Sequence, residues 1–233
     1  MSTQTTTSKP RLFWLDRLKG LAILSVVIFH FFQNYHDRLS LVDILARNGA
    51  KVGYAAVDIF FTIAGFNISY GLASLLIKSS KIPINWLNWL QQRLLRLYPT
   101  YWLILGTTLL IYYLFNNKFN LDFLELIRIF IGLTSYQEFK EINPGFWFFC
   151  VILQAYLITP LLLSTCNYQP QKILSLGILI GVVTKAICWF AQPGSELYGL
   201  LADKNLIFSY ITQFCLGIYW GFIYFQEQKF RKI

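Results

Sequence analysis

Long apolar stretches alternate with short polar ones along this chain of 233 residues. Crossing the hydrocarbon core of a bilayer takes about 20 mostly apolar residues, and about six stretches approach or meet that length. They run near Leu18–Tyr35, Tyr54–Ile77, Leu97–Phe115, Phe146–Cys166, Ile173–Ala191 and Leu206–Phe225. The pattern predicts an all-α fold, a polytopic transmembrane helical bundle.

A further apolar segment, Leu121–Leu133, is amphipathic, because it carries Asp122, Glu125 and Arg128. At about 13 residues it is shorter than a typical span. It predicts a short helix that is either re-entrant or lies at the membrane interface.

Composition excludes a soluble protein. Hydrophobic residues make up 56% of the chain and charged residues 13%, whereas soluble domains carry about 25% charged residues. The net charge is +9, but the basic residues stand mostly between the apolar stretches. Their placement is typical of membrane topology and of contact with anionic lipid headgroups, and it argues against nucleic-acid binding.

The apolar stretches define one membrane domain over residues 11–226, with no visible internal repeat or linker. Residues 1–10 are polar and rich in Ser and Thr, which predicts disorder, and residues 227–233 form a basic tail. The first apolar stretch is predicted to be a retained span, since no small-residue cleavage site follows it.

Lysine and arginine mark the cytoplasmic side of a membrane protein. They cluster before the first span, between the second and third spans, and in the C-terminal tail. If Leu121–Leu133 does not cross, all three clusters lie on one side. We therefore predict a multi-pass protein of the cytoplasmic (plasma) membrane with both termini in the cytoplasm. One observation argues against this topology, because it places Arg38, Arg47 and Lys51 on the outer side of the membrane.

Two ionisable residues of the first span, Lys19 and His30, are candidates for function, because charge at membrane depth is costly. They are eleven residues apart, so both leave the same face of a helix, separated by about 16 Å along its axis. The alternative is a lysine that reaches the headgroups and a histidine bonded to a neighbouring helix. The sequence does not decide between these interpretations.

Asp58, near the outer end of the second span, is the candidate partner of His30. It lies about 6 Å from the outer face by the rise of a helix, at a depth where it could meet the imidazole if the helices are neighbours. A carboxylate beside an imidazole fixes its tautomer and raises its basicity. Asp58 could equally sit at the headgroup boundary without a role.

Arg93 and Arg96 precede the third span and share one helix face, being three residues apart. With Arg17 and Lys19 they would make a four-cation cluster on the cytoplasmic side, and guanidinium groups suit phosphate recognition. The alternative is a stop-transfer charge cluster followed by an aromatic belt.

The remaining polar candidates are Asp16, Trp147, Gln154 and Tyr156, with structural or acceptor-site roles. Gln154 lies deep in the fourth span and must therefore hydrogen-bond to another group. No metal-ligand spacing appears in the sequence.

Four blocks, in this order, resemble the acyltransferase 3 family of multi-pass membrane O-acyltransferases that act on cell-envelope carbohydrates. Lys19 and His30 are similar to its opening, in which a basic residue precedes a catalytic histidine by eleven positions. Phe60 to Phe66 is similar to its F-F-x-x-S-G-F segment, with Ala64 for the usual Ser. The other two blocks are an R-x-x-R-x-x-P motif and a fourth span running from Trp to Pro. They are carried by Arg93, Arg96 and Pro99, and by Trp147, Gln154, Tyr156 and Pro160.

The chain departs from the family pattern in two ways. Many members that modify polysaccharides carry acidic residues in the fourth span, where this chain has Ile152 and Leu153. Members of the family have about ten spans, so the chain resembles the first two-thirds of a member.

The resemblance implies acyl transfer from cytoplasmic acyl-CoA, with acetyl as the expected group, to a hydroxyl of an envelope carbohydrate. The catalytic residues would be His30, as general base or alternatively as carrier of the acyl group, and Asp58, which would orient it. Lys19, Arg17, Arg93 and Arg96 would bind the donor. Acyl-CoA is expected as a co-substrate, with no bound cofactor; the other expected partners are the bilayer and the carbohydrate. The rival hypothesis is a truncated, non-catalytic relative or a subunit of an acyl-transfer system. A homo-oligomer or a missing C-terminal partner is a further expectation.

Overall fold

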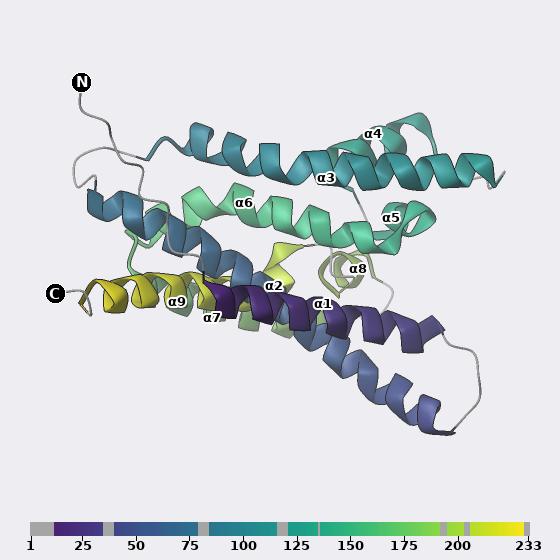
Figure 1. The fold of residues 1–233 in the computed structure, drawn as a ribbon, viewed down its shortest axis with the longest axis horizontal. Helices are drawn as coiled ribbons and strands as arrows, with labels where there is room; N and C mark the ends of the chain where they lie inside the picture. Colours follow the sequence, from purple (N-terminus) through teal and green to yellow (C-terminus); the bar gives the residue numbers. More distant parts are fainter. Residues whose placement is uncertain are drawn as a thin grey trace. The chain divides into compact units, whose positions relative to one another are not determined.

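The computed structural model describes residues 12–34, 40–78, 84–115, 121–134, 136–191, 195–202 and 206–230 (Figure 1). Over these residues the chain is helical and contains no strand. The predicted disordered segment 1–10 lies outside the described residues, as do the last three residues of the predicted basic tail, whose first part continues a helix up to Phe230.

The predicted all-α membrane bundle is confirmed. Four of the helices are long and apolar enough to cross a membrane: Ala55–Ala73, Trp86–Leu114, Pro144–Thr165 and Pro170–Phe190. The first and last predicted spans correspond to helices α1 (Phe13–Asn34) and α9 (Ile211–Phe230).

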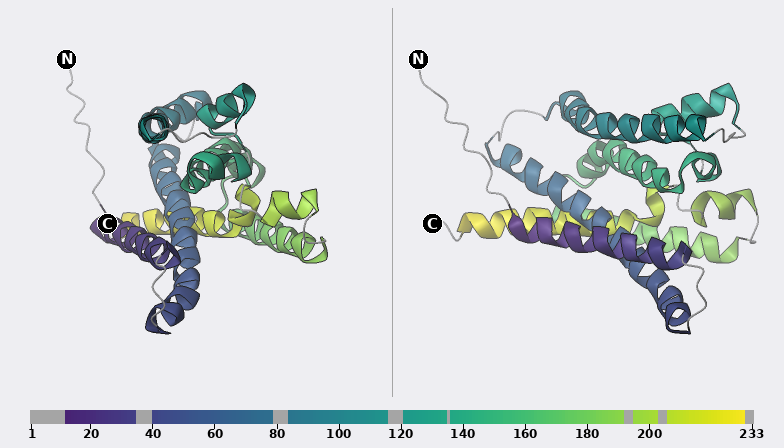
Figure 2. Two further views of the ribbon diagram at one scale, coloured as in Figure 1. Left: turned by 90° about the vertical axis from the view of Figure 1, so that its right-hand side faces the viewer. Right: turned by 45° about the vertical axis from the view of Figure 1, so that its right-hand side comes forward.

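The chain divides into two compact units, Met1–Ile63 and Ala64–Ile233. In the first unit, α1 and the first part of α2 (Ser40–Lys78) run in opposite directions (Figure 2). The helices approach closely at Gly53, where an added Cβ would lie 2.5 Å from Cγ of Phe29. A glycine is needed there because a side chain would separate the two helices.

Helix α2 differs from the sequence prediction, because it begins at Ser40 rather than near Tyr54. Its 39 residues extend about 58 Å at 1.5 Å per residue, nearly twice the thickness of the hydrocarbon core. Charged residues in the first turns of α2 interrupt the apolar pattern there, so a search for apolar stretches could not include them.

The second unit contains the rest of α2 and all later elements. These are α3 (Trp86–Leu114), α4 (Phe123–Ile131), α5 (Tyr136–Ile142), η1 (Pro144–Phe146), α6 (Trp147–Thr165), α7 (Pro170–Phe190), α8 (Glu196–Ala202), η2 (Ile207–Ser209) and α9. Helices α3 and α6 lie side by side and antiparallel (Figure 1). Aromatic rings join them along their length, and the rings of Tyr101 and Phe149 stack with centroids 3.7 Å apart.

Helix α9 packs against both α7 and the second part of α2 through glycines. An added Cβ on Gly65 would lie 2.1 Å from the backbone oxygen of Phe214, and one on Gly177 would lie 2.4 Å from Cβ of Cys215. Membrane helices commonly approach one another through small residues. The glycine of the F-F-x-x-x-G-F segment, Gly65, is therefore explained by packing.

The predicted short helix within Leu121–Leu133 is confirmed as α4, with nine residues. Asp122 and Glu125 form a reciprocal capping box at its start, each side chain accepting from the other residue's backbone N–H. Its C-cap, Gly132, has a φ of 82°, where a Cβ would also collide with Phe149. A polar capping box thus sets the start of the helix, and a glycine in the left-handed conformation sets its end.

Three aromatic donors of α3 satisfy the last backbone oxygens of α4, which packs along α3 (Figure 1). The bonds run from Tyr98 Oη to the oxygen of Ile131 (2.7 Å), from Tyr101 Oη to that of Ile129, and from Trp102 Nε1 to that of Phe130 (3.0 Å). The end of a helix otherwise needs water or a cap. The last turn of α4 is therefore satisfied within the protein.

Candidate functional site

Helix α1 presents Lys19 beside Asp16, one turn earlier. The Nζ of Lys19 lies 3.7 Å from Oδ1 of Asp16, and the two side chains are 37% and 39% exposed. Ion pairs this exposed contribute about 0–1 kcal/mol. Asp16 therefore holds Lys19 only weakly.

Lys19 and His30 lie on one uninterrupted helix, as the spacing predicted. At 100° per residue they are about 20° apart around the axis. His30 is exposed, and its ring centroid lies 5.0 Å from that of Phe29.

Arg17, two residues before Lys19, leaves α1 on nearly the opposite side, about 200° away. Arg17 and Lys19 therefore do not share a helix face.

Asp58 lies on the helix next to that of His30, within the same unit, and is half-buried. Its backbone oxygen accepts a hydrogen bond from Thr62 Oγ1 at 2.9 Å. Asp58 comes five residues after Gly53, about 7.5 Å along the axis from the contact with Phe29. The two predicted catalytic residues thus belong to neighbouring, antiparallel helices.

The arginines of the R-x-x-R-x-x-P motif lie inside α3, which begins with Asn85 as its N-cap; the Asn85 side chain accepts from the backbone N–H of Asn88 at 3.0 Å. The spacing i, i+4, i+7 brings Trp89, Arg93 and Arg96 to one face of this helix. The guanidinium carbon of Arg93 lies over the ring of Trp89, 5.3 Å from its centroid.

Tyr156 of α6 completes a cluster with these residues. Its ring meets that of Trp89 edge-on, with centroids 6.2 Å apart. In the part of the chain that the structure describes, no carboxylate is paired with either arginine. We call Trp89, Arg93, Arg96 and Tyr156 the arginine–aromatic cluster.

Trp89 is a member that the sequence prediction missed. It lies four residues before Arg93, and that helical spacing was the available signal. Its contact with Tyr156, on a helix more than 60 residues later in the chain, could not be read from spacing.

Trp147 and Gln154 act elsewhere, at the segment before α9. The ring of Trp147 stacks on that of Tyr210, with centroids 5.8 Å apart. The side-chain oxygen of Gln154 accepts from the backbone N–H of Ile207 at 3.1 Å, and its amide nitrogen lies 3.2 Å from Sγ of Cys150. Gln154 thus forms the hydrogen bonds that its depth in the span requires. Trp147 and Gln154 both contact the segment that precedes α9.

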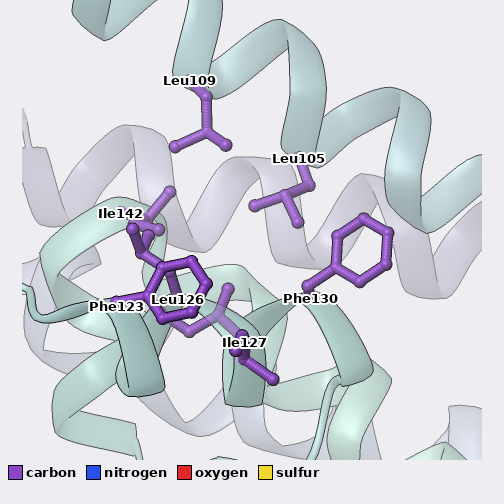
Figure 3. Close-up of a pocket in the computed structure, with 8 residues that line it drawn as sticks. Leu105, Leu109, Phe123, Leu126, Ile127, Phe130 and Ile142 are labelled. Atoms are coloured by element: carbon purple, nitrogen blue, oxygen red, sulfur yellow. The ribbon is translucent and has the colours of Figure 1, made fainter.

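An apolar cavity of about 290 Å³ lies between α3, α4 and α5 (Figure 3). Its described lining consists of Leu105, Leu109, Phe123, Leu126, Ile127, Ile129, Phe130 and Ile142. These side chains carry no titratable group, so the cavity offers no catalytic chemistry.

The described residues form an all-helical membrane protein that carries the arginine–aromatic cluster between α3 and α6. Residues 12–233 match the family model described as an acyltransferase domain, and the chain therefore belongs to the acyltransferase 3 family. The resemblance inferred from the four sequence blocks is confirmed.

A search of curated proteins found a similar relative from Bacillus subtilis (strain 168), named "Putative peptidoglycan O-acetyltransferase YrhL". It is 24% identical over 207 residues, which cover 78% of this chain and 29% of the relative. The chain thus spans less than a third of the length of that protein. No solved structure matches the chain.

Proposed function

We propose that this protein transfers an acetyl group from acetyl-CoA in the cytoplasm to a hydroxyl of a cell-envelope carbohydrate. The observation that carries the proposal is the match of residues 12–233 to the acyltransferase family. The name of the Bacillus subtilis relative supports O-acetylation and suggests peptidoglycan as the acceptor to test first.

Donor binding is assigned to Lys19 in the first unit and to Arg93 and Arg96 in the second; the predicted contribution of Arg17 is not kept, because Arg17 leaves the opposite side of α1 from Lys19. Arg93 and Arg96 support this assignment, because no described carboxylate neutralises them and guanidinium groups bind phosphate oxygens in pairs. The weak pairing of Lys19 with Asp16 supports it as well.

His30 is assigned as the general base. Its imidazole accepts the proton of the acceptor hydroxyl while the hydroxyl oxygen attacks the thioester carbonyl. The carbon–sulfur bond then breaks, and the imidazolium returns the proton to the departing thiolate of coenzyme A. Asp58 would orient the imidazole and stabilise its charged form.

The separation of Lys19 and His30 along one helix allows the reaction to join the two sides of the membrane. With both termini in the cytoplasm, Lys19 stands at the inner water boundary and His30 lies about 16 Å further along α1. The pantetheine arm of the donor would extend along this face, so coenzyme A need not cross the plasma membrane.

The test is the ester content of the envelope glycan in a strain that lacks the gene and expresses one variant at a time. The wild-type chain should restore base-labile O-acetyl groups, His30→Ala should not, and His36→Ala, which removes the other histidine of the sequence, should restore them. Immunoblots of the membrane fraction control for insertion.

Two results would count against the proposal. Full restoration by His30→Ala refutes the role of His30. A glycan with the same ester content in the presence and absence of the wild-type chain refutes acyl transfer and favours a non-catalytic relative or subunit.

A further inference from the structure

The indole of Trp89 carries a buried donor without a partner. The residue is 8% exposed, and its Nε1 has no hydrogen-bond acceptor among the residues that the structure describes. A buried polar group without a partner costs free energy, and native proteins contain few of them. An indole N–H can only donate, so the missing partner is an acceptor.

The groups around this indole also favour a negatively charged acceptor. Arg93 lies over the ring and Tyr156 meets it edge-on. Stacking on a ring occupies the flat face of a guanidinium and leaves the N–H groups on its edge available for oxygen atoms. Because Arg93 and Arg96 have no described carboxylate partner, the cluster offers positive charge and donors without a counter-charge.

We propose that Trp89 and Tyr156 are ligand-binding residues that, together with Arg93, hold a phosphate group of the acyl donor. This inference rests on the proposed function and adds two residues to it. The indole N–H and the phenol O–H each donate to a phosphate oxygen, and Arg93 supplies the charge.

Phosphate can also come from an anionic lipid headgroup, and binding experiments distinguish the two sources. The full-length chain is reconstituted in phosphatidylcholine nanodiscs, and the binding of coenzyme A is measured by calorimetry. The titration is repeated in nanodiscs that contain phosphatidylglycerol, with thermal stability recorded in both.

Trp89→Phe keeps an aromatic ring and removes the N–H, and Tyr156→Phe removes only the hydroxyl. Losing a hydrogen bond to a charged group weakens binding about 10- to 100-fold, so both variants should show a loss of this size in phosphatidylcholine. Trp86→Phe is the matched control, because Trp86 lies edge-on to Trp89 with centroids 5.6 Å apart. It should bind coenzyme A as the wild type does.

Unchanged affinity in both Trp89→Phe and Tyr156→Phe, with a wild type that binds, overturns this inference and leaves the proposed function standing. Absence of coenzyme A binding by the wild type contradicts the proposed function itself. If the substitutions instead abolish only a stabilisation by phosphatidylglycerol, the assignment to the donor is wrong and the site belongs to a lipid. If Trp89→Phe fails to fold, the affinity of Tyr156→Phe for coenzyme A alone tests the inference.

Discussion

Gln154 illustrates how a polar side chain is accommodated inside a membrane span. Its amide joins α6 to η2, a segment 53 residues away, and also contacts Cys150 one turn earlier. A buried amide costs free energy unless both its ends are bonded, and here both ends find partners. The residue therefore fixes the start of α9 against α6.

Replacing Gln154 with Leu should lower the free energy of unfolding by about 1–3 kcal/mol, because the backbone N–H of Ile207 loses its acceptor. Thermal denaturation in detergent measures the change. Ser164→Ala, at an exposed position of the same helix, is the control and should have little effect. Equal stability of Gln154→Leu and the wild type would show that the bond contributes nothing.

At this scale the sequence identified polar residues better than their partners. The depth of Gln154 predicted that it must bond, and the spacing of Arg93 and Arg96 predicted a shared helix face. The contacts of Gln154 with Ile207, of Trp147 with Tyr210 and of Trp89 with Tyr156 could not be predicted, because they join elements that are distant in the chain.

Among the helices, α4 depends on α3 for the end of its last turn. Tyr101 is 4% exposed and donates to the backbone oxygen of Ile129, which is 1% exposed. Tyr101→Phe should lower the free energy of unfolding by about 1–3 kcal/mol by leaving that oxygen unbonded. Tyr113→Phe on the same helix, 80% exposed, is the matched control. Thermal denaturation measures both variants, and equal midpoints for Tyr101→Phe and Tyr113→Phe would contradict this account of α4.

The close approach of α2 and α9 gives a second prediction for the helices. Gly65→Ala places a methyl group against the backbone oxygen of Phe214, and overpacking of this kind costs about 1–3 kcal/mol. Gly106→Ala meets nothing within 4 Å and should keep or slightly raise stability, since alanine favours a helix. Thermal unfolding of both variants measures the difference. A Gly65→Ala protein as stable as Gly106→Ala would refute the packing role.

Helices that follow the apolar pattern were predicted well. The span predicted as Phe146–Cys166 is α6, Trp147–Thr165, and the span predicted as Ile173–Ala191 is α7, Pro170–Phe190. The sequence prediction placed the starts of α2 and α3 too late. Both helices begin in segments that are less apolar than the membrane-spanning segments that follow them. Local capping, as at Asn85, sets the start of α3.

For the whole molecule, an even number of crossings with both termini in the cytoplasm remains a prediction. It follows from the basic clusters and from the shortness of α4, which has nine residues. A fluorescent protein fused after Ile233 should be bright, and alkaline phosphatase at the same position should be inactive. The reverse result would place the C-terminus outside and require an odd number of crossings.

The central claim is that one helix supplies both a donor-binding cation and the catalytic base, and acetyl transfer in membrane vesicles tests it most directly. With acetyl-CoA varied, Lys19→Ala should raise KM about tenfold and leave kcat unchanged, because it removes a phosphate contact. His30→Ala should lower kcat about 100- to 10,000-fold, the usual contribution of a general base. A His30→Ala protein with the kcat of the wild type, or a Lys19→Ala protein with an unchanged KM, would contradict the account.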